Sequence, residues 1–309
     1  MRAARVRATT GPMSLPDILC IGSVLWDVIG RSQTAMRRGA DVPGRITRLP
    51  GGVALNIAMT LRRFGLRPAL RSCVGRDAEG EELVAACRRM GLITDTLYRS
   101  ADLPTDRYMA IEGANGLVAA VADAHSLEAA GKHILTPLGD GRLGSPGTPW
   151  TGPIALDGNL TAALLSEIAA SPLFAGADLR VAPASPGKAE RLLPLICHPR
   201  ATLYVNLQEA GRLCRTRFAS APDAAQGLLA RGALRVLVTD GARACADGMA
   251  GRGIVTDAPP PVPVTRVTGA GDTFMAAHLV AEMRGSDRAA ALGAALRAAA
   301  DHVSRDTGS

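Results

Sequence analysis

The sequence has few aromatic residues and no regular spacing of metal-binding side chains. Phe, Trp and Tyr make up 3% of its 309 residues, so it offers few rings on which nucleic-acid bases could stack. Its six cysteines and five histidines form no CxxC pair and no spacing typical of a zinc site. We therefore expect free, mostly buried thiols, no structural zinc and no nucleic-acid partner.

Long apolar runs are also missing. No uninterrupted stretch is long enough to cross a bilayer, and the first residues lack the apolar segment of a secretory signal. These absences favour a cytoplasmic protein with no membrane partner. Residues 1–15 contain Arg2, Arg5 and Arg7 but no acid, and we expect them to form a disordered basic tail. That tail supplies three charges of the net +7, which weakens any argument from charge to nucleic acid.

The rest of the chain has the pattern of a folded α/β protein. Its hydrophobic fraction is 47% and its charged fraction 20%, as in soluble globular proteins. Short apolar runs such as residues 17–24 and 68–75 predict strands, and segments such as 51–65 and 187–197 predict helices. From Ile154 onward strands and helices alternate regularly. This predicts a three-layer α/β/α sandwich with a mostly parallel central sheet.

One segment interrupts this alternation. Residues 107–123 predict an antiparallel hairpin with Asn115-Gly116 at its turn. Two antiparallel strands inside an otherwise alternating chain indicate a second, smaller sheet that projects from the main one.

Near the end of the chain, Gly269-Ala270-Gly271 and Asp272 come directly before a long apolar helix. In open α/β sheets, ligands bind where loops lead from strand ends into helix N-termini. Small residues let main-chain N–H groups approach an anion there, and the helix dipole favours its charge. An acid beside a bound phosphate could accept the proton of an attacking hydroxyl. Because Asp is also a common N-cap, the motif alone leaves both interpretations open.

Two further motifs lie upstream. Gly51 and Gly52 precede a helix that carries Asn56 one turn inside it, an arrangement that suits a polyhydroxylated ligand. Gly-Gly is also a common turn, and Asn56 could be a surface residue. Asn206 and Glu209 meet at another helix start, where they could hold hydrated Mg²⁺ or form a capping box. A nicotinamide dehydrogenase is excluded, because the first strand is not followed by GxGxxG.

In this order and spacing, the motifs resemble those of the ribokinase/PfkB family of sugar and nucleoside kinases, over about residues 17–305. The resemblance implies a kinase domain over 16–309, with a small β-sheet lid built from about 27–50 and 94–124. It also implies ATP and Mg²⁺ as cofactors. The residues that it assigns to phosphoryl transfer are Asp272 as catalytic base, Gly269, Ala270 and Gly271 around the phosphate, Asn206 and Glu209 for Mg²⁺ (Glu209 through water), and Thr239 and Gly241 beside the nucleotide.

For the acceptor, the resemblance is nearest to pseudouridine kinases, so we expect transfer to the 5′-hydroxyl of pseudouridine. Another nucleoside or a free sugar, and a non-catalytic ligand-binding relative, are the alternatives. Asp27 follows a buried strand, where it could accept from two hydroxyls or be a solvated loop acid. Tyr108 and Asp123 could bind the base, or could pack and end the hairpin. The full acceptor set is Asp27, Gly51, Gly52, Asn56, Tyr108, Asp123, Ser185 and Lys188.

The chain also departs from the family pattern. Arg266 stands where many relatives have an acid three residues before the first glycine of the GAGD motif, which leaves a monovalent-cation site in doubt. Ala182 stands where an Asp is expected, and Val24-Leu25-Trp26 follows Gly22-Ser23 in place of a more polar run. Lid sheets in the family often pair between subunits, so the resemblance implies a homodimer through the lid.

Overall fold

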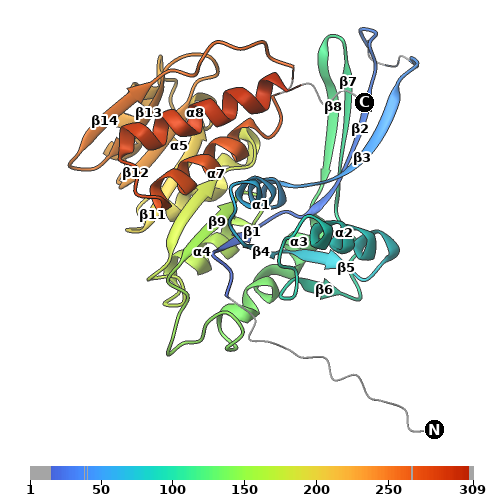
Figure 1. Cartoon of the computed structure of the whole chain (residues 1–309), viewed down its shortest axis with the longest axis horizontal. Coiled ribbons are helices and arrows are strands. Elements are labelled where there is room, and N and C mark those ends of the chain that lie inside the picture. Colours follow the sequence, from blue (N-terminus) through green and yellow to red (C-terminus); the bar gives the residue numbers. More distant parts are fainter. Residues whose placement is uncertain (1–14, 38, 40, 266, 306–309) are drawn as a thin grey trace.

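The computed structural model describes residues 15–37, 39, 41–265 and 267–305. The predicted basic tail, apart from Leu15, and Arg266 lie outside this range. The described chain forms a three-layer body with a smaller sheet standing beside it (Figure 1). This confirms the predicted fold class.

The central sheet has eight strands. In spatial order they are β14 (Gly253–Asp257), β13 (Cys245–Met249), β12 (Arg235–Thr239), β11 (Ala201–Asn206), β10 (Asp178–Ala182), β9 (Pro153–Asp157), β1 (Ile18–Ile21) and β4 (Pro68–Arg71). Neighbours from β12 to β4 are parallel, as predicted, whereas β13 and β14 add an antiparallel hairpin at one edge.

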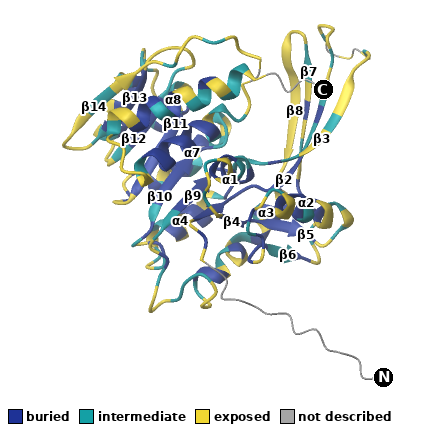
Figure 2. Cartoon of the chain, viewed as in Figure 1, coloured by how far each residue is buried: buried dark blue, intermediate teal, exposed yellow. Residues whose placement is uncertain are grey.

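Helices cover both faces of this sheet because its strands are apolar on both sides. Along β1, Ile18 and Cys20 belong to one core cluster and Leu19 and Ile21 to the other. Figure 2 shows inner strands such as β9 and β10 buried between the helical layers, whereas the edge strand β14 is largely exposed. The first cluster includes side chains of α1 (Val53–Arg63), α2 (Ala78–Arg89), α7 (Ala270–Met283) and α8 (Arg288–Ser304). The second includes α3 (His125–Ala130), the 3₁₀ segments η1 (Gly131–Leu138) and η2 (Pro186–Leu195), α4 (Ala162–Ala170), α5 (Leu207–Cys214) and α6 (Ala221–Ala230).

The smaller sheet has four strands. They are β3 (Arg45–Gly51), β2 (Leu25–Arg31), β7 (Arg107–Gly113) and β8 (Gly116–Asp123), in that order. The predicted hairpin is β7–β8, but Gly113 pairs with Gly116, so the turn residues are Ala114 and Asn115. Strands β5 (Cys73–Gly75) and β6 (Tyr98–Ser100) form a separate pair.

Two other expectations concern cysteines and membranes. All six cysteines are free, and Cys20, Cys73, Cys87 and Cys245 are buried, as predicted. Among the described residues, no helix combines the length and apolar character that a membrane span requires.

Candidate active site

The first turn of α7 carries the predicted catalytic acid, and the loop that leads into this turn is held by His302. Gly269 caps the helix with a left-handed φ of 83°, and a Cβ atom there would lie 3.2 Å from the His302 ring. His302 Nε2 donates to the Thr268 carbonyl at 2.9 Å, so Nδ1 accepts from Thr273 Oγ1 at 3.0 Å. The imidazole of α8 therefore holds both sides of the loop that leads into α7.

The space in front of this turn is open. A Cβ atom added to Gly271 would meet no heavy atom within 4 Å, and Ala270 and Gly271 begin a helix without a side-chain cap. The first N–H groups of a helix have no carbonyl partner within it, and the helix dipole favours an anion there. The Ala270 amide, however, donates to the Val267 carbonyl at 3.1 Å, so the amides of Gly271 and Asp272 are the ones in this turn that would bind a phosphate.

Asp272 is half-buried, and its carboxylate is bound by a different helix. Asn56 Nδ2 of α1 donates to Asp272 Oδ2 at 3.0 Å. Because Gly269 is the N-cap of α7, Asp272 does not serve as one. Burial, which has the largest effect, and the charges of Asp157, Asp27 and Glu209 together raise the pKa of Asp272 to about 7, although the Asn56 hydrogen bond lowers it. A carboxylate with a pKa near 7 suits general-base catalysis at neutral pH.

Asp27 lies within β2, not in a solvated loop, and it is half-buried. Burial raises its pKa to about 6. A Cβ atom on Gly51 would lie 2.0 Å from Asp27 Oδ2, and one on Gly52 would lie 2.5 Å from the Ser23 carbonyl oxygen. The glycine pair is thus required by the packing of Asp27 and Ser23 against the chain. Its contact with sugar hydroxyls stays a prediction.

The structure separates the two hairpin residues predicted to bind the base. Tyr108 is in register with Asp27 across β2 and β7, so the two side chains share a face of the small sheet. Asp123 is in register with Arg107, the neighbour of Tyr108, and therefore points to the opposite face. There it accepts from His125 Nδ1 at 2.8 Å, a hydrogen bond that lowers the pKa of the Asp123 carboxyl.

Of the other predicted acceptor residues, Ser185 is the N-cap of η2 and Lys188 lies within it. Lys188 Nζ donates to Asn159 Oδ1, while the Lys188 amide closes a turn onto the Ser185 carbonyl at 3.0 Å. Burial lowers the pKa of Lys188. The ammonium group is partly buried and contacts Asn159, which lies two residues after the end of β9.

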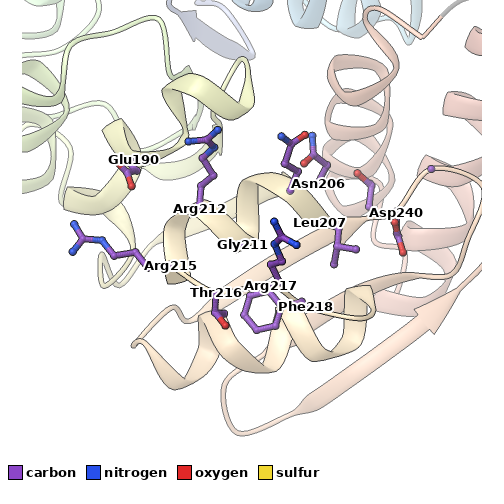
Figure 3. A pocket seen from close by; sticks show the side chains of 13 residues that line it. Glu190, Asn206, Leu207, Gly211, Arg212, Arg215, Thr216, Arg217, Phe218 and Asp240 are labelled. Carbon is purple, nitrogen blue, oxygen red and sulfur yellow. The ribbon is translucent and has the colours of Figure 1, made fainter.

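A cavity of about 770 Å³ lies beside α5 and the end of β12 (Figure 3). Thr239 and Gly241, which the family resemblance places beside the nucleotide, line it together with Asn206, which the resemblance assigns to Mg²⁺. Glu209 and Asp272 are not among its lining residues. Asn206 and Glu209 form a full capping box, in which the Asn206 side chain accepts from the Glu209 amide at 2.9 Å and Glu209 Oε2 accepts from the Asn206 amide at 2.8 Å. The capping alternative is therefore present in the structure, and the magnesium role stays a prediction.

One buried acid at this site was not predicted. Asp157, at the end of β9, has no exposed surface and accepts four hydrogen bonds. Two of its donors belong to Ser23, one is the Ala54 amide of α1 and one is the Asn159 amide. Its signal in the sequence is a single acid at the end of the apolar run 153–157.

With this geometry in place, comparison with known proteins identifies the family. A model described as "pfkB family carbohydrate kinase" matches residues 15–307. The chain belongs to the PfkB carbohydrate kinase family. A carbohydrate kinase from Agrobacterium tumefaciens of known structure is 27% identical, with 95% of this chain and 92% of that one covered at a TM-score of 0.77. The ribokinase of Arabidopsis thaliana, solved with ribose and ATP, shares the fold at 18% identity, with 96% and 95% of the two chains covered and a TM-score of 0.74.

A curated relative has a more specific name. The pseudouridine kinase of Escherichia coli K12 is 32% identical over 94 residues, which are 30% of this chain and 30% of that protein. The match thus spans about a third of the relative's length. What these comparisons show for this chain is membership of a family described as carbohydrate kinases.

Proposed function

We propose that this protein transfers the γ-phosphate of ATP to the 5′-hydroxyl of pseudouridine. The observation that carries the proposal is the Asp272 carboxylate, which is held by Asn56 beside the open N-terminus of α7. An acceptor hydroxyl placed there gives its proton to Asp272 as its oxygen attacks the phosphorus. The first-turn amides of α7 then face the charge on the transferred phosphoryl group.

Acceptor binding is proposed for the face of the small sheet that carries Asp27 and Tyr108. Both side chains point from adjacent strands to the same side, and Asp27 lies against Gly51 at the start of α1. A carboxylate can accept from two neighbouring ribose hydroxyls, and a phenol can donate to or accept from a base. Movement of this sheet over the acceptor would exclude water during transfer.

The nucleotide and Mg²⁺ are assigned to the cavity along α5. Mg²⁺ commonly keeps several waters and is bound through substrate phosphates and one or two carboxylates. Glu209 accepts from the Asn206 amide through Oε2, and we assign its carboxylate to a metal-bound water. When bound, Mg²⁺ neutralises phosphate charge.

Pseudouridine is favoured as the acceptor by the similarity to the E. coli enzyme, and the resemblance adds Ser185 and Lys188 at the start of η2. A panel of pseudouridine, uridine, adenosine, ribose and fructose, assayed for ADP release, tests the proposal. We expect the highest kcat/KM for pseudouridine. A higher kcat/KM for another acceptor would identify that compound as the substrate in place of pseudouridine. If no acceptor supports ADP release, a non-catalytic ligand-binding protein is favoured.

We further propose that two copies of the chain associate through the small sheet. Its face opposite Asp27 carries Ile46, Met109 and Val121 at 78%, 52% and 67% exposure. Ile111 extends the same apolar face. Exposed apolar surfaces of this kind commonly mark interfaces, and the family resemblance identifies a second copy as the partner.

A further inference from the structure

The N-terminus of α1 is capped by residues that are remote in sequence. Its N-cap, Gly52, has no side chain, so the first amides find other acceptors. Val53 N donates to Ser23 Oγ at 2.8 Å and Ala54 N donates to Asp157 Oδ2 at 3.1 Å. The Leu55 amide donates to the Ser23 carbonyl at 3.3 Å. The next residue along the helix is Asn56, which holds Asp272.

Hydrogen-bond directions show that Asp157 acts as a carboxylate. Ser23 Oγ accepts from the Val53 amide and from Asn159 Nδ2 at 2.9 Å, so its single proton goes to Asp157 Oδ2 at 3.0 Å. Asp157 also accepts from the amides of Ser23 and Asn159, at 2.8 and 2.7 Å. Four donors stabilise its charged form, although complete burial raises its pKa.

Lys188 sets the direction of this chain of donors. An ammonium group can only donate, so its contact with Asn159 must be to Oδ1, and Asn159 Nδ2 then faces Ser23. Donation runs from Lys188 through Asn159 and Ser23 to Asp157. The Asp157 carboxylate also lies against Gly22, where a Cβ atom would come within 2.2 Å of Oδ2. The network is therefore closely packed, and the donor and acceptor of each of these hydrogen bonds are determined.

We propose that Asp157 is a positioning residue for phosphoryl transfer, which fixes the start of α1 and, through Asn56, the orientation of the Asp272 carboxylate. This inference rests on the proposed role of Asp272. Asp157 also acts through its charge, because it is one of three acids that raise the pKa of Asp272. The groups around Asp272 are Asp27 from β2, Asn56 from α1, Asp157 from β9 and Glu209 from α5, with His302 of α8 behind Gly269.

Three variants distinguish the effect of Asp157 on the position of Asp272, the effect of its charge on the Asp272 pKa, and its effect on the stability of the protein. Asp157→Asn removes the charge and one acceptor, whereas Ser23→Ala removes the hydroxyl cap and keeps the charge. Asp247→Asn is the matched control, since Asp247 is equally buried but pairs with Arg235 and Arg288 in another network. Each variant is measured for melting temperature, for kcat against pH, and for the Asp272 pKa by carboxyl ¹³C NMR.

We expect Asp157→Asn to lower kcat about 10-fold and the Asp272 pKa by about half a unit or more. Ser23→Ala should lower kcat by a similar factor and leave the Asp272 pKa unchanged. If Asp157→Asn does not fold, Ser23→Ala alone tests the inference. Asp247→Asn should lower only the melting temperature. Unchanged kcat and pKa in Asp157→Asn, or equal changes in Asp247→Asn, would overturn the inference. A parent protein without kinase activity would instead reject the proposed function, while the NMR titration would still test the effect of Asp157 on Asp272.

Discussion

At the scale of single residues, Asp272 differs from an ordinary surface acid because of what surrounds it. Burial and the nearby charges of three other acids raise its pKa to about 7, and a hydrogen bond from the Asn56 side chain limits this rise. A carboxylate that is hard to ionise is also a better proton acceptor once ionised. The same surroundings that favour catalysis therefore cost stability at alkaline pH.

This balance predicts opposite pH dependences for activity and stability. The folded pKa of Asp272 lies above its unfolded value of 3.8, so its stabilising contribution is complete below about pH 4 and is lost as pH rises through 7. Turnover should rise with pH through the same range, with an acid limb near 7. Melting temperatures of parent and Asp272→Asn measured from pH 5 to 8 should diverge, with the variant more stable at pH 8. Parallel curves would show that Asp272 titrates normally.

Gly51 gives a second prediction at this scale. A methyl group there would overlap the Asp27 carboxylate, so Gly51→Ala should displace Asp27 and raise the acceptor KM about 10-fold or more. Gly147→Ala is the control, because a Cβ atom at Gly147 meets nothing within 4 Å. Steady-state kinetics with varied acceptor measures both variants. An unchanged KM in Gly51→Ala would remove Asp27 from the acceptor site.

At the scale of elements, α7 connects the site to a buried charge cluster. Asp272 lies in its first turn, and Glu282 near its last residue pairs with both Arg180 and Arg235. Those arginines come from β10 and β12, and all three side chains are at most 17% exposed. The far end of the helix is thereby fixed to the central sheet.

Glu282→Gln should therefore lower the free energy of unfolding by about 3 kcal/mol, because two buried guanidinium groups lose their shared counter-charge. Urea unfolding measures this loss. Glu167→Gln on the exposed side of α4 serves as the control and should change stability by less than about 0.5 kcal/mol. If the two variants are equally stable, the cluster does not anchor α7.

Element prediction from sequence succeeded where periodicity was strong. The alternating segments and the 107–123 hairpin appear as expected. The predicted strand 68–75 splits into β4 and β5, which belong to different sheets, because pairing partners are not visible in a single run of residues. The predicted helix 187–197 is the 3₁₀ segment η2, which contains Pro194 and so lacks one helix amide.

Site prediction had a similar limit. Residues within one local motif, such as Asn206 and Glu209, could be paired from sequence, although their role remained open. Asp157 could not be recognised, since three of its four donors lie more than 100 residues away, in Ser23 and Ala54. Only the folded sheet brings the ends of β1 and β9 together at the start of α1.

At the scale of the whole molecule, the small sheet leaves one apolar face uncovered. If two copies associate there, charged substitutions should prevent it. Val121→Glu and Met109→Glu should shift the protein from dimer to monomer in sedimentation velocity, while Leu234→Glu, exposed on the main body, should not. A monomeric parent protein would refute association through this sheet.

The central claim is that Asp272 accepts the proton of the acceptor hydroxyl, and one comparison tests it most directly. Single-turnover phosphoryl transfer is measured for the parent and for Asp272→Asn, with ATP and acceptor affinities determined separately by calorimetry. We predict a rate loss of about 1,000-fold or more, with both affinities within about 3-fold of the parent. A variant that transfers phosphate within about 10-fold of the parental rate would contradict the account.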